Sequence, residues 1–421
     1  MILIKNAKVL TPKGVVEENV QIEENRISSI GKSVDKSDVV INGKGKALIP
    51  GFFNTHTHAA MTLFRSYADD MILQEWLEKK IWPLEAKLDD KAVYWGTKLA
   101  CVEMLKSGTV FFNDMYFFPP AVAKAAEECG IRACVSAAFF DFFNPDLLEE
   151  NLKNAVKNLK EIEKYDVLRA IGPHAVYTVS LDGLKRAAEI AEEMNIFIHF
   201  HLAETEKEVL DFKKQHGNLI VRTLDEMGFL SKRLIAAHSV WLEDAEIELL
   251  AKRGVSVAHC PVSNMKLCVG KAIRYGEMKN AGVNFTIGTD GAASNNNLDM
   301  FEEMKFAALL QKFYYSDPTL MKAEEVFEAA TINAARAFNL KSGVVKEGYL
   351  ADLVLINLKK PYIQPEHDLV ANLVYAASSG CVDTVIVDGK VVVESGYFMG
   401  DEGKEIEIME EVAKIASKLT S

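Results

Sequence analysis

Residues 47–58 read ALIPGFFNTHTH, an apolar run that ends in two histidines two positions apart. In a strand, side chains at i and i+2 point to the same face, so His56 and His58 project together from the strand end. Two buried neighbouring imidazoles need a partner, and a divalent metal ion is a suitable one because neutral imidazole is a common zinc ligand. A histidine pair that bonds only to solvent is the alternative, and the motif alone leaves both open.

Composition and charge narrow the class of protein. The 421 residues are 49% hydrophobic and 26% charged, which is ordinary for a folded protein and sufficient for one large domain with an appendage. A net charge of −12 argues against a nucleic-acid partner, although not against a nucleoside, which has no phosphate backbone. The chain shows no secretory signal, no apolar run long enough to cross a bilayer, and six scattered cysteines. We therefore expect a cytoplasmic protein with reduced cysteines and no membrane partner.

The middle of the chain alternates apolar, strand-like runs with segments of helical spacing. Most of these runs are continuously apolar, as expected for a parallel sheet buried on both faces. Eight such units predict an α/β fold, a TIM-like (β/α)8 barrel. An open doubly wound sheet is the competing architecture, but no Gly-x-Gly-x-x-Gly follows a strand. The strand candidates are residues 48–54, 110–114, 132–139, 168–172, 196–200, 234–237, 255–258 and 284–288.

Both ends of the chain carry short β-rich segments. Neither end can close a core alone, so we expect a small β-sandwich domain built from both termini. Asp388-Gly389 is the expected hairpin turn of the last pair of strands. The predicted division is 1–50 with 347–421 for this discontinuous domain and 51–346 for the catalytic barrel.

Polar residues repeatedly follow the predicted strands. In a (β/α)8 barrel the carboxyl ends of the strands form one rim, and that rim carries the chemistry. Seven of the nine histidines lie at or near it, and such shared placement makes independent accidents improbable. The rim residues are His56, His58, His174, His199, His201, Glu204, His238, His259 and Asp290.

Several segments resemble a known family. NTHTH, HFHLAE, AHS and GTDGA, in this order, resemble the amidohydrolase superfamily in the branch that uses one divalent metal ion. RSYADDMILQEWLEKKIWPLE, GPHAVYT, HLAET and HCPVSNMKL resemble more closely the 5-methylthioadenosine/S-adenosylhomocysteine deaminases, which include 5′-deoxyadenosine deaminases. The resemblance covers essentially the whole chain. It implies a metal-dependent hydrolase that converts an adenosine-type nucleoside to the inosine analogue and ammonia.

The resemblance also implies a metal site. His56, His58, His201 and Asp290 would bind one divalent ion, zinc by preference, although iron or manganese accept the same ligands. Three imidazoles and a carboxylate leave one coordination position open, as a catalytic site requires. His199 is assigned to the barrel wall. Because homo-oligomers are common in the family, a tetramer or dimer is expected.

Three residues would carry catalysis according to the resemblance. Glu204 would protonate the ring nitrogen beside the amine-bearing carbon, and His238 would hydrogen-bond the attacking water. Asp290 would also act as a base, passing the proton of the water to the departing ammonia. The alternative for Glu204 is an exposed glutamate at a helix N-terminus, where a carboxylate is favoured anyway.

The resemblance implies the substrate contacts as well. Glu85 would accept hydrogen bonds from the ribose hydroxyls, His174 would contact the nucleoside, and Trp76 would cover the ring or the 5′ substituent, with Glu204 at the base. EWLEKKIWPLEAKL also fits an amphipathic helix in which Trp76 and Glu85 serve only the helix. Ser294 after the last strand is a further candidate for the pocket wall.

The chain departs from the family in one segment. Relatives that accept S-adenosylhomocysteine hold its carboxylate with arginine at the barrel mouth, whereas residues 139–146 read FFDFFNPD and contain none. This favours a short apolar 5′ group, as in 5′-deoxyadenosine or 5′-methylthioadenosine, over S-adenosylhomocysteine. Arg132, Arg169 or a residue of another subunit would reverse the preference. Val176 and Val240 also differ from the expected residues and are interpreted as pocket tuning.

Other functions share parts of this pattern. A guanine deaminase or an s-triazine hydrolase would use the same ligands, but a ribose contact by Glu85 has no purpose on a free base. A non-catalytic scaffold of this fold would lose ligands, and here every ligand position is filled. Zinc deaminases with Pro-Cys-x-x-Cys are excluded because residues 258–263 read AHCPVS.

Overall fold

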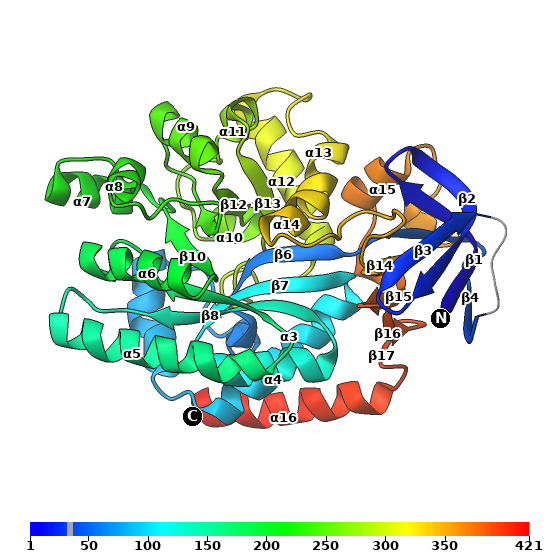
Figure 1. The fold of residues 1–421 in the computed structure, drawn as a ribbon, viewed down its shortest axis with the longest axis horizontal. Coiled ribbons are helices and arrows are strands. Elements are labelled where there is room, and N and C mark those ends of the chain that lie inside the picture. Colours follow the sequence, from blue (N-terminus) through cyan, green and yellow to red (C-terminus); the bar gives the residue numbers. More distant parts are fainter. Residues whose placement is uncertain (32–36, 421) are drawn as a thin grey trace.

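Eight parallel strands form a nearly closed barrel, which confirms the predicted architecture (Figure 1). The computed structural model describes residues 1–31 and 37–420. Neighbouring barrel strands follow each other in chain order, and at the closure Thr55 donates a hydrogen bond to the Ile287 carbonyl over 2.9 Å. The strands are β6 (Phe52–Thr57), β7 (Thr109–Tyr116), β8 (Arg132–Phe139), β9 (Leu168–Pro173), β10 (Phe197–Leu202), β11 (Leu234–His238), β12 (Ser256–His259) and β13 (Asn284–Ile287).

Helices between the strands cover the outside of the barrel (Figure 1). Side-chain caps begin several of them: Asp89 accepts a hydrogen bond from the Ala92 amide over 2.8 Å, and Ser180 accepts one from the Gly183 amide over 3.1 Å. The helices are α3 (Asp90–Lys106), α4 (Pro119–Cys129), α5 (Pro145–Glu161), α6 (Leu181–Glu193), α7 (Glu206–His216), α8 (Ile220–Glu226), α9 (Asp244–Arg253), α10 (Pro261–Lys266), α11 (Tyr275–Ala281), α12 (Met300–Tyr315), α13 (Ala323–Ala329) and α14 (Ile332–Ala337).

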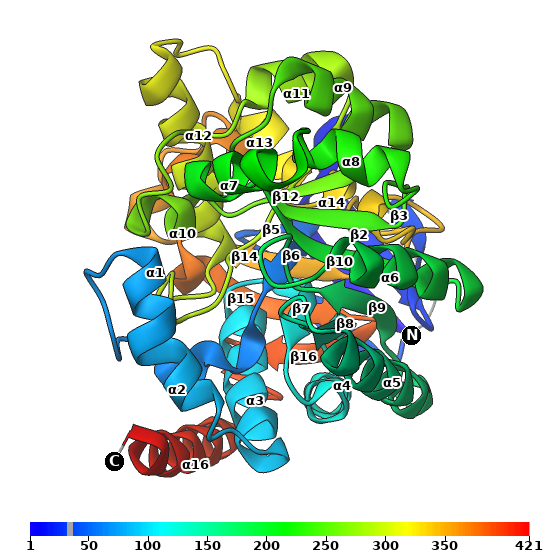
Figure 2. The same cartoon turned by 90° about the vertical axis from the view of Figure 1, so that its left-hand side faces the viewer.

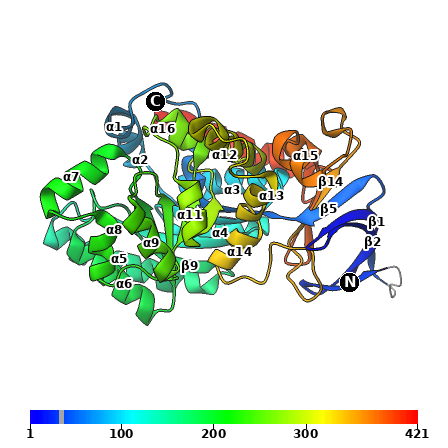
Figure 3. The same ribbon diagram turned by 90° about the horizontal axis from the view of Figure 1, so that it is seen from above.

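Strands from both termini form a second, mixed sheet at one end of the molecule (Figure 3). Its order is β17-β16-β15-β14-β5-β1-β2-β3, with β4 paired to β1. Ile4, Val9, Leu48 and Leu355 are among the side chains of its own buried core. Its strands are β1 (Ile2–Thr11), β2 (Gly14–Glu23), β3 (Arg26–Gly31), β4 (Val39–Asn42), β5 (Lys46–Pro50), β14 (Leu353–Asn357), β15 (Val382–Val387), β16 (Lys390–Glu394) and β17 (Tyr397–Phe398). The expected sheet from both termini is confirmed, whereas the boundaries 1–50, 51–346 and 347–421 stay a prediction.

The strand predicted over residues 48–54 is wrong, because this apolar run supplies strands to both sheets. β5 ends at Pro50 and pairs with β1 and β14, and β6 begins two residues later in the barrel. Gly51 lies between them, and a Cβ at this position would come within 2.2 Å of Cγ1 of Val110. The break is invisible in the hydrophobic pattern since both strands are buried, and glycine permits the close passage.

Two further helical segments flank the barrel. After β6, a 3-10 helix (Ala59–Phe64) leads into α1 (Leu73–Trp76), a π-helical turn (Leu77–Ile81) and α2 (Trp82–Glu85), as the amphipathic pattern predicted. At the other end of the chain, α16 (Glu402–Thr420) packs against α3 (Figure 2). The remaining helical segments are α15 (Leu369–Tyr375) and three short 3-10 turns, at Ile162–Lys164, Pro361–Ile363 and Ser379–Cys381. No helix in the described ranges is long and apolar enough to cross a membrane.

Candidate active site

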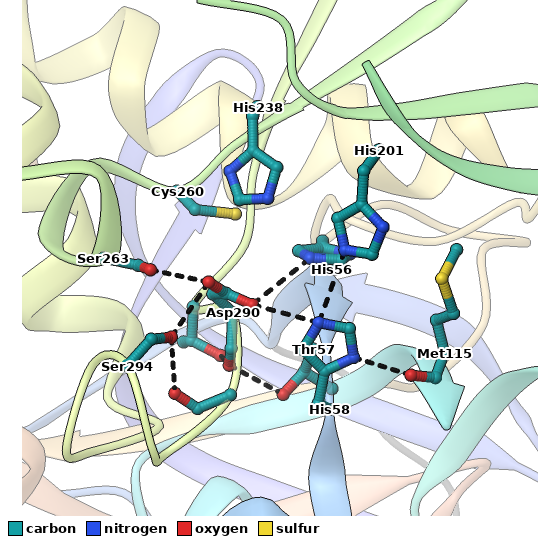
Figure 4. Close-up of polar contacts among 12 residues, drawn as sticks. His56, Thr57, His58, Met115, His201, His238, Cys260, Ser263, Asp290 and Ser294 are labelled. Atoms are coloured by element: carbon teal, nitrogen blue, oxygen red, sulfur yellow. Dashed lines mark hydrogen bonds and ion pairs between the residues drawn. The ribbon is translucent and has the colours of Figure 1, made fainter. Parts of the chain in front are cut away.

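Four side chains predicted as metal ligands converge at the carboxyl-terminal rim of the barrel (Figure 4). His56 and His58 come from the end of β6, His201 from β10, and Asp290 from the turn after β13. Oδ1 of Asp290 lies 3.4 Å from Nε2 of His56 and 3.2 Å from Nε2 of His58. Nε2 of His201 lies 3.4 Å from Nε2 of His58. The alternation of the strand thus brings the two histidines of the opening motif to one point.

These distances and one orphaned atom fit a divalent cation. The buried Nε2 of His56 has no hydrogen-bond partner, although a buried polar nitrogen normally has one. The possible ligand atoms of His56, His58 and Asp290 lie within 4.8 Å of one another, and so do those of His56, His201 and His238. Imidazole nitrogens and a carboxylate are suitable ligands for zinc and for several other divalent ions.

Hydrogen bonds at Nδ1 orient the rings. Nδ1 of His58 donates to the Met115 carbonyl over 2.6 Å, and Nδ1 of His201 donates to the His174 carbonyl over 2.9 Å. A ring that donates from Nδ1 presents the lone pair of Nε2, which is the atom that faces the centre of the cluster. The hydrogen bonds that orient metal-binding histidines are therefore present for these two residues.

The acid–base properties of the cluster are strongly perturbed. Burial alone would raise the pKa of Asp290, but its close contacts and charge interactions with His56 and His58 hold that pKa well below its usual value. Burial lowers the pKa of His56 to about 3. Burial would also lower the pKa of His58, but Asp290 raises it to about 9. Asp290 is thus held as a carboxylate next to the imidazoles.

Two serines complete the environment of Asp290. Its Oδ2 accepts hydrogen bonds from Oγ of Ser263 over 2.6 Å and from Oγ of Ser294 over 2.9 Å (Figure 4). These bonds fix the carboxylate and leave Oδ1 directed at the two histidines of β6. The sequence predicts Ser294 at the pocket wall, whereas Ser263 on α10 is not predicted, although it lies within the segment HCPVSNMKL.

Glu204 and His238 lie beside the cluster. Oε1 of Glu204 is 3.9 Å from Nδ1 of His238, and burial raises the pKa of Glu204. Only 7% of Glu204 is exposed, which contradicts the alternative of a solvated helix-end glutamate. Nδ1 of His238 lies 2.9 Å from Oδ1 of Asn264, so Nε2 is the nitrogen left for other contacts.

The backbone around this rim is strained. Ala203, His238, Ser239 and Asp290 all have positive φ, at 49°, 66°, 53° and 62°. Such conformations are costly for residues other than glycine and cluster at functional sites, where the surrounding structure holds them. His238 is the last residue of β11, and the other three residues follow the ends of β10, β11 and β13.

Glu208 on α7 was not predicted and supports Glu204 from behind. Its carboxylate accepts hydrogen bonds from the backbone amides of Ala203 and Glu204, at 3.1 and 2.8 Å. Burial, and then the charge of Glu204, raise the pKa of Glu208 to about 8. The two buried carboxyls are therefore coupled. A glutamate four positions after another in a helical segment carries no signal that would have revealed this contact.

The residues predicted to bind substrate line the same cavity as the cluster. Trp76, Glu85 and His174 share it with His58, His201, Glu204, His238 and Asp290. Glu85 accepts a hydrogen bond from Oη of Tyr116 over 2.8 Å, and burial raises the pKa of Glu85. Glu85 and Trp76 thus both line the cavity, and Tyr116 is a cavity residue that sequence reasoning missed.

Aromatic rings form the mouth of the cavity. Phe117 and Phe140 are stacked with centroids 6.0 Å apart, and Phe140 lies 4.8 Å from the His174 ring. Among the described residues that line the cavity, none is a lysine or arginine. Arg132 instead pairs with Asp352 over 2.9 Å.

Two residues of the predicted rim, and three others named in the sequence analysis, lie outside this cavity. His259 is buried on β12, and neither of its ring nitrogens has a hydrogen-bond partner. His199 is also fully buried and contacts His56, as described below. Arg169 at the start of β9 lies 3.3 Å from Glu163. Val176 lines a neighbouring groove, and Val240 is buried.

Fold and site together define a barrel hydrolase with a candidate His/Asp metal site. Residues 47–392 match the model of a family described as the amidohydrolase family. The chain is 81% identical to 5-methylthioadenosine/S-adenosylhomocysteine deaminase 1 of Archaeoglobus fulgidus, over 100% of this chain and 99% of the relative. The chain belongs to the amidohydrolase family, in the group of 5-methylthioadenosine/S-adenosylhomocysteine and 5′-deoxyadenosine deaminases. The family resemblance seen in the sequence is therefore confirmed.

More distant relatives agree. A 5′-deoxyadenosine deaminase of Methanoregula boonei is 47% identical over 99% of this chain and 95% of its own. The crystal structure of an adenosine deaminase from Xanthomonas campestris with bound zinc superposes with a TM-score of 0.94 at 34% identity, over 100% of this chain and 98% of that one. An atrazine chlorohydrolase from Arthrobacter aurescens has a TM-score of 0.90 at 23% identity, over 99% of this chain and 100% of that one, and shows the shared fold alone.

Proposed function

We propose that the protein is a hydrolytic deaminase that converts a 5′-substituted adenosine to the inosine analogue and ammonia. One observation carries this proposal. A single cavity is lined by His58, His201 and Asp290 of the cluster, by Glu204 and His238, and also by Glu85. The base and the ribose of one nucleoside can therefore be held in the same cavity. The 81% identical relative, named a deaminase of such nucleosides, supports the same substrate class.

We infer one divalent ion, zinc in preference to iron or manganese, held by His56, His58, His201 and Asp290. The orphaned Nε2 of His56 and the Nδ1 hydrogen bonds of His58 and His201 support this ligand set. When bound, such an ion supplies Lewis acidity that activates a water for attack at neutral pH. The zinc in the Xanthomonas structure favours the same metal here.

The protein side chains would move the protons. Glu204, whose pKa is raised by burial, can deliver a proton to the ring nitrogen next to the amine-bearing carbon. His238, held at Nδ1 by Asn264, directs Nε2 toward the attacking water. Asp290, held as a carboxylate, accepts a proton from that water and passes it to the leaving ammonia.

The remaining cavity residues would hold the nucleoside. Glu85 can accept hydrogen bonds from two ribose hydroxyls while Tyr116 fixes one of its oxygens. His174 and Trp76 present ring faces and edges for packing against the base or the 5′ group. The absence of arginine and lysine from the described lining favours 5′-deoxyadenosine or 5′-methylthioadenosine over S-adenosylhomocysteine, whose carboxylate needs a cation.

The experiment is a substrate panel with the metal-replete protein. Ammonia release is followed with 5′-deoxyadenosine, 5′-methylthioadenosine, S-adenosylhomocysteine, adenosine and guanine. The two short, apolar 5′ substituents are expected to give the highest kcat/KM. Activity with guanine or an s-triazine alone would replace the proposal with one of its rivals. A protein that binds metal but releases ammonia from none of these would point to a non-catalytic scaffold.

Assembly, location and domain limits complete the proposal. We propose a cytoplasmic homo-oligomer, a tetramer or dimer, whose only partners at the site are small molecules. Light scattering on the purified protein tests the oligomeric state. We retain residues 51–346 as the catalytic barrel and 1–50 with 347–421 as the second domain.

A further inference from the structure

His199 lies behind the ring of His56 and does not line the cavity. Its side chain is fully buried, and its Nε2 lies 2.7 Å from Nδ1 of His56, with the two rings perpendicular. On the opposite edge, Nδ1 of His199 lies 3.1 Å from Oγ of Ser136. A residue assigned to the barrel wall thus has a specific partner in the proposed metal site.

His56 differs from the other imidazoles of the site in what holds its Nδ1. In His58, His201 and His238, Nδ1 meets a carbonyl or amide oxygen. These oxygens belong to Met115, His174 and Asn264, at 2.6, 2.9 and 2.9 Å. A carbonyl oxygen only accepts, so it fixes the proton on Nδ1 and the lone pair on Nε2. The partner of His56 is an imidazole, which can either donate or accept.

The number of protons on the rings of His199 and His56 allows two arrangements of the hydrogen bond between them. A neutral His199 carries one N–H. If that proton is on Nε2, Nδ1 of His56 must accept, and the proton of His56 moves to its own Nε2, which removes the lone pair at the cluster. If it is on Nδ1, His199 accepts from His56, and Nε2 of His56 is free to bind. The hydroxyl of Ser136 can accept from Nδ1 of His199 or donate to it, so it serves either arrangement. A metal ion on Nε2 of His56 leaves the proton of that ring on Nδ1, so only the second arrangement is compatible with the proposed metal site.

We propose, on the basis of the metal site proposed above, that His199 is a positioning residue that sets the tautomer of His56. With its proton on Nδ1, directed at Oγ of Ser136, His199 presents the lone pair of Nε2 to His56. His199 therefore accepts from His56, and the buried Nε2 of His56 presents its lone pair to the metal ion. Removing hydrogen-bond partners of metal ligands typically weakens metal binding by about 10–100-fold.

Matched variants test this role by metal affinity rather than turnover. His199→Leu keeps a buried side chain but has no acceptor, whereas His199→Gln places Oε1 near the position of Nε2. His259→Leu is the control, because His259 is an equally buried histidine whose nitrogens have no partner. Competition between a chelator and the Co²⁺-loaded protein gives the dissociation constant, and the visible Co²⁺ spectrum reports the ligand geometry.

His199→Leu is expected to raise the Co²⁺ dissociation constant by about 10–100-fold, with His199→Gln and His259→Leu within about threefold of the wild type. Unchanged binding in His199→Leu, or equal weakening by Gln and Leu, would overturn the proposal. A wild-type protein that binds no Co²⁺ would refute the metal site itself, which is a separate result.

The wild-type protein provides a second measurement that does not depend on how the variants fold. With ¹⁵N-labelled histidine, only nine side chains give signals, and long-range ¹H–¹⁵N spectra distinguish the two tautomers. His199 and His56 are both expected as Nδ1–H forms in the metal-loaded protein. Observation of His199 as the Nε2–H form would overturn the assignment even where every variant failed to fold.

Discussion

Replacement of Glu208 by glutamine should change how stability depends on pH. Glu208 is 6% exposed, and its pKa is raised from 4.5 to about 8 by burial and by Glu204. Since the folded pKa exceeds the unfolded one, the native state binds more protons between these values. The favourable contribution of this bound proton to the free energy of unfolding is therefore fully present below about pH 4.5 and is lost as pH rises through about 8.

The size of the effect follows from the shift. The difference between 8 and 4.5 is 3.5 pKa units, which at roughly 1.4 kcal/mol per unit gives about 5 kcal/mol over the whole window. Glu208→Gln cannot ionise, so it is free of this loss. It also replaces one carboxylate oxygen by an NH2 group, which faces a backbone amide and costs about 1–3 kcal/mol at every pH. The variant should be less stable than the wild type near pH 5. Its free energy of unfolding should then rise steadily relative to that of the wild type toward pH 9.

Urea unfolding of the chelated proteins at several pH values measures this difference. Glu246→Gln is the matched control, because Glu246 is also buried and accepts two backbone amide hydrogen bonds, at 3.0 and 3.0 Å. Burial raises its pKa too, but it lies away from Glu204, so its variant should show a smaller pH slope relative to the wild type. Parallel pH curves for Glu208→Gln and the wild type would refute a protonated Glu208 in the native state.

Four other substitutions address the site and the fold. Glu204→Gln should retain metal but lose turnover by at least about a hundredfold, the scale of general acid–base catalysis; near-normal kcat would remove Glu204 from the mechanism. His201→Ala should lose both metal content, measured by elemental analysis, and ammonia release, whereas full metal occupancy would contradict its role as a ligand. Glu85→Ala should lower kcat/KM for nucleosides far more than for a free base such as adenine, and an equal loss on both would indicate a structural residue. Gly51→Ala should lower the free energy of unfolding by about 1–3 kcal/mol, because its Cβ would meet Val110; unchanged stability would show that the two sheets separate easily.

The sequence predicted the barrel and its rim because both follow from short-range periodicity. His56 and His58 needed only the two-residue alternation of a strand, and Asp290 needed only its place after an apolar run. The same local pattern failed at residues 48–54, where two strands of different sheets share one continuous apolar run. Burial on both sides of Pro50 leaves no polar residue to mark the change of sheet.

The residues that sequence reasoning missed are those defined by contacts between distant segments. Ser263 and Tyr116 matter because their hydroxyls reach Asp290 and Glu85 across the barrel, and ordinary serines and tyrosines carry no mark of such a contact. The sequence analysis named His199 but assigned it to the barrel wall. Residue order does not show which of two neighbouring imidazoles donates the hydrogen bond, because this depends on a third residue. Hydrogen-bond direction is a property of the three-dimensional network rather than of residue order.

The pairing of β5 with β14 sets an order of events during protein synthesis. Pro50 lies opposite Leu353, so one edge of β5 is without its neighbour until the ribosome has made all eight barrel strands. Until then the nascent chain exposes an unpaired strand edge, a known template for aggregation. The C-terminal helix arrives still later, when the Leu419 carbonyl accepts a hydrogen bond from Lys87 over 2.9 Å. A premature stop anywhere before β14 would therefore release a chain in which β1 to β5 can pair with one another but the outer edge of β5 stays open.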